Sequence, residues 1–188
     1  MNYKECFEYI RSDYYRYTGQ RASLLRIWFY GWTHPAVRYT FWLRLSQHRG
    51  WAFLLTKFMH RRLMRKYGLL IPSATHIGYG LYIGHCLGVV INHQSVIGNN
   101  CNISQFVTLG GVKGHAPVIG DNVYIGPNVC IVGGVHIGND VTIGAGSVVT
   151  RDVPDNVTVA GVPARIISES GHPEYVNRRY NVYNFSQR

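Results

Sequence analysis

The sequence has little that would place the protein outside the cytoplasm or across a membrane. No apolar run approaches the roughly 18 residues of a membrane-spanning helix, because arginines interrupt every candidate. The opening residues, Met-Asn-Tyr-Lys-Glu-Cys, lack the apolar core of a signal peptide, which predicts a cytoplasmic protein. The four cysteines form no C-x-x-C pair, so neither a disulfide framework nor a structural zinc site is expected.

Acidic residues are also scarce. The 188-residue chain has 9 Asp and Glu against 19 Lys and Arg, a formal net charge of +10. Residues 1–70 contain 13 of the basic residues and 3 of the acidic ones, so this part carries the whole excess. It also holds all four tryptophans, whereas 17 of the 21 glycines follow residue 70. With 46% hydrophobic residues the chain can bury a core, and the change in composition predicts a boundary near residue 70.

Helices are predicted for the basic N-terminal part. One apolar face with the 3.6-residue helical period comprises Trp51, Leu54, Leu55, Phe58 and Met59. Gly68 suits the end of this helix, and Pro35 suits the first turn of an earlier one. A further helix is expected near residues 21–32. Three helices would therefore precede the glycine-rich part.

An aliphatic residue recurs at every sixth position of the second part. The longest run is Ile119, Ile125, Ile131, Ile137, Ile143 and Val149. The same spacing occurs upstream, but it slips by two residues between Ile83 and Ile91 and by four between Leu109 and Ile119. A short fixed period indicates a solenoid whose coils stack on their neighbours. Six residues fit a short strand and a corner, so three sides make one coil, and about five coils are expected.

Four motifs in this region are similar to those of a known enzyme family. They are Gly-His-Cys-Leu-Gly-Val-Val-Ile at 84–91, Val-Thr-Leu-Gly-Gly at 107–111, Ile-Gly-Ala-Gly-Ser-Val-Val-Thr at 143–150 and Ala-Gly-Val-Pro-Ala-Arg-Ile at 160–166. On these residues the chain resembles the hexapeptide-repeat acyltransferases, in the branch of serine acetyltransferases and bacterial surface-polysaccharide O-acetyltransferases. The resemblance implies a mainly β, left-handed parallel β-helix at 71–167, with a helical cap at 1–70 and an irregular tail at 168–188.

Direct transfer of an acetyl group from acetyl-CoA to a hydroxyl is the reaction that the resemblance implies. A base must take the hydroxyl proton, and a histidine suits this role because its pKa lies near neutrality. His85 is the predicted base, because it lies at the first slip and matches the catalytic histidine of the family's Asp-His-Ala-Thr-Gly motif, here residues 84–88. His115, in the longer slip, matches a family histidine that helps to hold the acceptor; a solvent-facing loop residue is its other interpretation.

A coenzyme A site is implied by motif position. The family binds this cofactor through backbone groups between neighbouring coils and through basic residues near the last coil. The corresponding residues here are Pro127, Ala145, Thr150, Arg151 and Arg165. For Ala145 and Thr150, ordinary packing of the solenoid is an equal interpretation. The resemblance further implies homotrimers with active sites between adjacent prisms, and no metal is expected.

The chain departs from the serine acetyltransferases at three positions. Leu70 and Gly84 stand where that family has aspartates near the base, and Gly114 replaces an arginine before the loop histidine. An amino acid needs charged partners for its ammonium and carboxylate groups. The predicted acceptor is therefore a sugar hydroxyl of a polysaccharide precursor, soluble or lipid-linked, with L-serine as the alternative.

Other interpretations stay open for both parts of the chain. A β-helical zinc carbonic anhydrase would need three converging histidines, such as His85, His93 and His115, and a non-catalytic scaffold needs none. The basic helices are expected to cap the open end of the solenoid, with peripheral contact at the inner face of the membrane as a further role. Nucleic-acid binding is not expected, because no motif for it is present.

Overall fold

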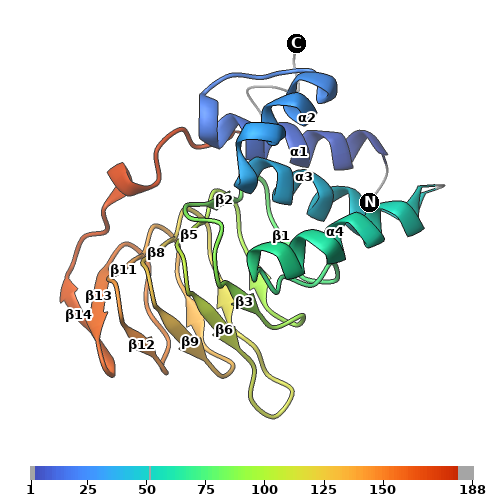
Figure 1. Ribbon diagram of the computed structural model, residues 1–188. Helices are drawn as coiled ribbons and strands as arrows, with labels where there is room; N and C mark the ends of the chain where they lie inside the picture. The colour runs from blue at the N-terminus through green and yellow to red at the C-terminus, as the bar shows by residue number, and fades with distance from the viewer. Residues whose placement is uncertain (1–2, 51, 182–188) are drawn as a thin grey trace.

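Four helices cover the first coil of a three-sided parallel β-helix (Figure 1). The computed structural model describes residues 3–50 and 52–181. The helices are α1 (Tyr3–Thr18), α2 (Leu24–Thr33), α3 (Pro35–Gln47) and α4 (Phe53–Tyr67). Pro35 begins α3, and Gly68 ends α4 with a left-handed φ of 64°, so both predicted boundaries are confirmed. Helix α1 was not expected from the sequence.

The predicted apolar face of α4 is wrong in its orientation. Leu54 is 82% exposed and Phe58 is 56% exposed, whereas the buried side chains of α4 are Thr56, His60 and Leu63. Trp51 lies outside the described residues. The helix takes this orientation because His60 packs on Tyr39 of α3, with 3.3 Å between Nε2 and the Tyr39 hydroxyl. The apolar side chains at the start of α4 are consequently left on the surface.

Each side of the β-helix is a parallel sheet. The first face contains β1 (His76–Ile77), β4 (Val96–Ile97), β7 (Val118–Ile119) and β10 (His136–Ile137). The second face contains β2 (Tyr82–Ile83), β5 (Asn102–Ile103), β8 (Tyr124–Ile125), β11 (Thr142–Ile143) and β13 (Thr158–Gly161). The third face contains β3 (Val90–Ile91), β6 (Thr108–Gly110), β9 (Cys130–Val132) and β12 (Val148–Val149). The repeated isoleucines are buried in the common core, as their spacing predicts.

The strand register shows where the repeat is interrupted. Cys130 pairs with Val148, eighteen residues later, which is one regular coil. Tyr82 pairs with Asn102 after twenty residues, and Val96 pairs with Val118 after twenty-two. The two predicted slips are therefore real insertions, and they lie at corners because the strands themselves keep their pairing.

The β-helix has about four coils rather than the five expected. Strand β13 starts another coil, but β14 (Ala164–Ser168) turns back and pairs with it in the antiparallel sense. Gly161, with a φ of 103°, lies at this reversal. The hairpin ends the second face, because a returning strand occupies the edge on which a further coil would stack.

The C-terminal segment returns from β14 to the helices (Figure 1). It has little regular structure beyond η1 (Pro173–Tyr175), as expected, but its contacts are specific. The backbone N–H of Tyr180 donates to Asn100 Oδ1 at 2.7 Å, and Arg179 forms an ion pair with Asp140 at 2.7 Å. Arg16 of α1 also donates to the Asn177 carbonyl at 3.1 Å, so the segment ties the last coils to the helical end of the molecule.

A buried ionic network joins the helices to the first coil. Arg44 of α3 donates two hydrogen bonds to the carboxylate of Asp13 of α1, at 2.8 and 3.0 Å. The same guanidinium donates to the carbonyl oxygens of Ile77 and Gly78, at 2.7 and 2.6 Å, and Asp13 also accepts from the N–H of Leu81 at 2.8 Å. Both side chains are 1% exposed. The carbonyls and N–H of the first coil are therefore satisfied by the helices.

His60 makes the helical part sensitive to acid. Burial, aided by the neighbouring Lys57 and Arg61 charges, lowers the pKa of His60 from 6.5 to about 4. Because protonation then favours the unfolded chain, His60 contributes full stability above pH 6.5 and loses it as the pH falls toward 4. The loss is expected to be on the order of 3 kcal/mol. Thermal melts of the wild type and of His60→Gln between pH 7.5 and 4.5 would measure it.

The variant should lose less stability over this range than the wild type, since its amide does not titrate. His93→Gln, at an exposed histidine, serves as the control and should follow the wild type. Parallel curves for the wild type and His60→Gln would contradict the assignment.

Candidate active site

His85 lies in the two-residue insertion between β2 and β3. Its side chain is exposed, and within the described parts of the chain no hydrogen bond or ion pair is formed by its imidazole. Leu70, at the position of the family's orienting aspartate, is 48% exposed and enters the third face through its backbone, with its N–H on the Val89 carbonyl at 2.7 Å. The His85 imidazole is therefore exposed, and its orientation depends on the backbone that carries it.

That backbone is held by two residues that the sequence analysis missed. The hydroxyl of Tyr17, from α1, donates to the Ile83 carbonyl at 3.1 Å and accepts from the Ile83 N–H at 2.9 Å. It thereby satisfies the open edge of β2 two residues before His85. Burial raises the pKa of Tyr17 well above its usual value, so the hydroxyl keeps its proton for this bond. A tyrosine on a helix carries no sequence signal for such a role.

Phe106 is the second missed residue. It has a φ of 59°, a left-handed value rare for a bulky side chain, at a corner where the later coils have Asn128 and Gly146. Its ring covers Gly88, where an added Cβ would lie 2.4 Å from Cδ1 of the ring. The Phe106 N–H also donates to the Leu87 carbonyl at 3.1 Å. The sequence does hold a signal for Phe106: it is an aromatic residue at a corner position that favours glycine or asparagine.

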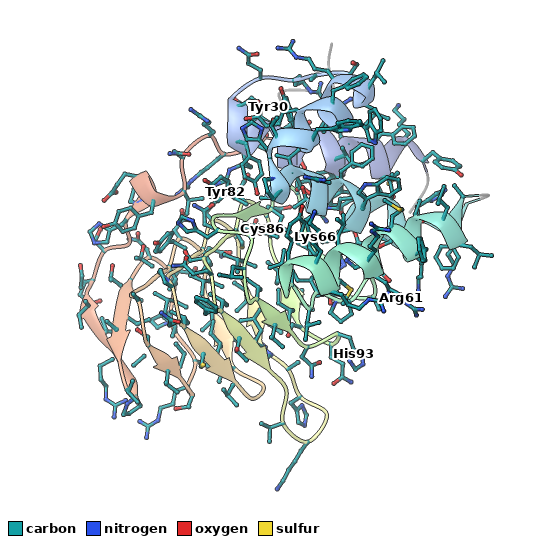
Figure 2. The ribbon with its side chains drawn as sticks, in the orientation of Figure 1. Tyr30, Arg61, Lys66, Tyr82, Cys86 and His93 are labelled. Atoms are coloured by element: carbon teal, nitrogen blue, oxygen red, sulfur yellow. The ribbon has the colours of Figure 1, made fainter. Side chains whose placement is uncertain are left out.

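Cys86, next to His85, is suited to packing rather than to nucleophilic attack. Burial raises the pKa of its thiol to about 12, so the thiolate is scarce at neutral pH. The side chain packs against the core of the β-helix. Figure 2 shows Cys86 where the β-helix meets the helices.

His115 ends a tight hairpin formed by the four-residue insertion. The N–H of Val112 donates to the His115 carbonyl at 2.8 Å, and the His115 N–H donates back to the Val112 carbonyl at 3.0 Å. Lys113 and Gly114 between them both have positive φ, as a two-residue hairpin turn requires. An added Cβ at Gly134, in the next coil, would lie 2.8 Å from Cβ of His115. The hairpin of residues 112–115 is therefore well defined, and it packs on the next coil.

The predicted site residues divide between two corners of the prism. His85, Pro127 and Ala145 follow β2, β8 and β11, so they lie on the edge between the second and third faces, here called the His85 edge. His115 and the pair Thr150–Arg151 follow β6 and β12, on the edge between the third and first faces, here called the His115 edge. The hairpin of residues 112–115 projects away from the helices (Figure 1). Within one chain the third face separates the two histidines.

Small residues line the later coils of the His85 edge. The Gly146 N–H donates to the Pro127 carbonyl at 2.8 Å, and an added Cβ at Gly126 would lie 2.9 Å from the Ala145 backbone nitrogen. Ala145 is exposed, and Arg165 on β14 is exposed beyond it. In the described ranges neither Arg165 nor Arg151 forms an ion pair, so both guanidinium groups are available to anions.

Among residues 3–50 and 52–181, no group of three His, Cys, Asp or Glu side chains is arranged to hold a metal ion. His93 follows β3 and so lies on the His115 edge with His115, whereas His85 lies on the other edge. These three histidines therefore form no common ligand set within one chain.

Comparison with known proteins supplies the family. Residues 116–151 match the family model "Bacterial transferase hexapeptide (six repeats)". The solved serine acetyltransferase of Brucella abortus is 30% identical, with a TM-score of 0.71, and the match covers 90% of this chain and 70% of that one. The serine acetyltransferase of Neisseria gonorrhoeae in complex with serine is 32% identical, with a TM-score of 0.71 and coverage of 86% and 69%. The chain belongs to the hexapeptide-repeat acyltransferases, in the serine acetyltransferase-like branch.

Membership in this family agrees with the predicted left-handed β-helix. The serine acetyltransferase of Synechococcus elongatus is 44% identical over 109 residues, which cover 55% of this chain and 44% of that protein. The chain spans about half the length of the curated relatives it matches.

These relatives overturn the prediction of a sugar acceptor for polysaccharide synthesis. Relatives at 35–44% identity are serine acetyltransferases. The prediction rested on missing charges at Leu70, Gly84 and Gly114. It failed because three missing charges do not show which other groups face the acceptor. Charged groups facing an acceptor need not come from the same chain.

Proposed function

We propose that this chain is an acetyl-CoA-dependent O-acetyltransferase that transfers acetyl to the hydroxyl of L-serine. The observation that carries the proposal is the exposed His85, placed by an insertion on the same edge as the small residues at 126–127 and 144–146. Further support comes from relatives that are serine acetyltransferases and from one such structure solved with coenzyme A.

His85 acts as the general base in this proposal. Its imidazole takes the proton of the serine hydroxyl while the hydroxyl oxygen attacks the thioester carbonyl of acetyl-CoA. The tetrahedral intermediate then expels the thiolate, which takes the proton from the imidazolium. The products are O-acetylserine and coenzyme A. Arg151 and Arg165 are proposed to bind the cofactor's phosphates, with Pro127, Ala145 and Thr150 along its path.

A homotrimer in the cytoplasm is part of the proposal. His85 and His115 lie on opposite edges of the third face, so they meet at one site only if the His85 edge of one copy faces the His115 edge of the next. Such a contact joins two different surfaces, and three copies related by a three-fold axis close the ring. Each ring would contain three equivalent sites between neighbouring chains.

Thiol release from acetyl-CoA by the purified chain tests the acceptor. We expect turnover with L-serine and little with D-serine, L-threonine or a panel of nucleotide sugars. Turnover with a sugar and none with L-serine would overturn the assignment of L-serine as the acceptor. Failure of the chain to bind coenzyme A in calorimetry would overturn the whole assignment and favour a scaffold.

A further inference from the structure

The outer side of α2, α3 and α4 has two adjoining apolar hollows. One, of about 330 Å³, lies between the three helices and is lined by Trp28, Trp32, Phe41, Trp42 and Met59 among others. The other, of about 300 Å³, is lined by Phe7, Trp42, Leu45, Phe53 and Leu55 among others. Trp42 borders both. The hollows and the exposed apolar side chains of α2 and α4 around them are here called the helical face.

Large apolar side chains stand exposed on the helical face. On α2, Leu25, Phe29 and Trp32 are 65%, 57% and 64% exposed. On α4, Leu54 and Leu55 are 82% and 56% exposed, in addition to Phe58. Single exposed apolar residues are common on proteins, but six on two helices, with Trp32 and Leu55 lining the two hollows, mark a binding surface.

The charge around the helical face has one sign. Residues 14–120 contain no Asp or Glu, so α2, α3 and α4 have no acidic side chain. On α4, Leu54 and Phe58 are followed on the same side, at helical spacing, by Arg61, Arg62 and Arg65. Figure 2 labels Arg61 and Lys66 on this helix, and both side chains are exposed. The surface is therefore aromatic and aliphatic at one end and cationic at the other.

We propose that the helical face docks on a bilayer surface rich in anionic lipids. Trp, Phe and Leu side chains enter the boundary between headgroups and acyl chains, while Lys and Arg side chains pair with lipid phosphates. In the described parts of the chain, no helix is both long and apolar enough to cross a bilayer, so the contact is peripheral. Docking of this face is independent of the acetyl-transfer reaction.

Charge favours a bilayer over a second copy of the chain. Arg61, Arg62 and Arg65 are exposed and residues 21–70 contain no acidic residue, so two copies meeting through this face would bring like charges together. Nucleic acid would match the cations, but it offers no apolar layer for Leu25, Phe29 and Leu54. An anionic bilayer offers acyl chains to the apolar end of the helical face and phosphates to its cationic end.

Flotation of the full chain with phosphatidylcholine vesicles, with and without phosphatidylglycerol, tests the proposal. We expect binding to the phosphatidylglycerol vesicles, a blue shift of tryptophan fluorescence on binding, and weakening as salt is raised. Arg61→Glu with Arg62→Glu, and separately Phe29→Ser with Phe58→Ser, should each reduce binding by at least about tenfold.

Matched controls change the same chemistry elsewhere. Lys113→Glu reverses an exposed charge on the far hairpin, and Ile167→Ser removes a side chain that is 66% exposed on β14; both should bind like the wild type. Absent or equal binding to the two vesicle types would overturn the proposal. So would a fall in the oligomer mass of Phe29→Ser/Phe58→Ser by light scattering, with vesicle binding unchanged, because the face would then join copies of the chain.

Discussion

Replacing His85 with alanine is expected to lower kcat by about 10²- to 10⁴-fold, the range typical of a lost general base. Binding of coenzyme A should be unchanged, because the predicted cofactor residues lie on later coils and on β14. Steady-state thiol release and calorimetry with coenzyme A measure the two quantities separately. A large loss in kcat with unchanged cofactor affinity is the expected combination.

His76→Ala is the matched control for this experiment. His76 is also an exposed histidine of the first coil, but it lies on β1 and the first face, away from the His85 edge. Its replacement should leave kcat within about twofold of the wild type, since surface substitutions away from a site have small effects. Full activity of the His85→Ala variant would remove the assigned base.

Replacing Arg44 with alanine is expected to cost about 3–5 kcal/mol of unfolding free energy, since it leaves Asp13 as an unpaired buried charge. The carbonyls of Ile77 and Gly78 also lose their donor. Asp13→Ala should cost a similar amount, because the Arg44 guanidinium then keeps only carbonyl partners. Urea unfolding of the two variants and of the double variant measures these losses and the coupling between the residues.

A surface ion pair on α1, the helix of Asp13, is the control for the buried pair. Arg11 and Glu8 of α1 lie 3.5 Å apart, and their side chains are 34% and 26% exposed. Arg11→Ala should cost less than about 1 kcal/mol, as exposed pairs do. If Arg44→Ala cost no more than Arg11→Ala, the buried network would not be what holds the helices to the first coil.

The coiled architecture was predictable because one physical signal repeats along half the chain. Every sixth side chain must be aliphatic to fill the interior, so the spacing from Ile119 to Val149 shows which residues of each face point inward. The two insertions were equally visible, because a residue added to a fixed period shifts every later one. They also drew attention to His85 and His115.

Features that depend on contacts between distant segments were not predictable. The orientation of α4 is set by His60 against Tyr39, whereas the period of its apolar residues alone favoured the opposite side. Tyr17 reaches Ile83 across more than sixty residues of sequence. The acceptor was also predicted wrongly, because the missing charges at Leu70, Gly84 and Gly114 do not show which other groups face the acceptor.

The stacking of the coils also fixes the distance between residues on different coils. Along the second face, four steps separate the coil of His85 from β13 and the neighbouring Arg165. At about 4.8 Å a step, the span is on the order of 19 Å. Adding or deleting one coil would lengthen or shorten that span by a single step and leave every other coil unchanged. In the proposed site, the distance from His85 to the phosphate-binding Arg165 can therefore change by whole coils, but not by smaller increments.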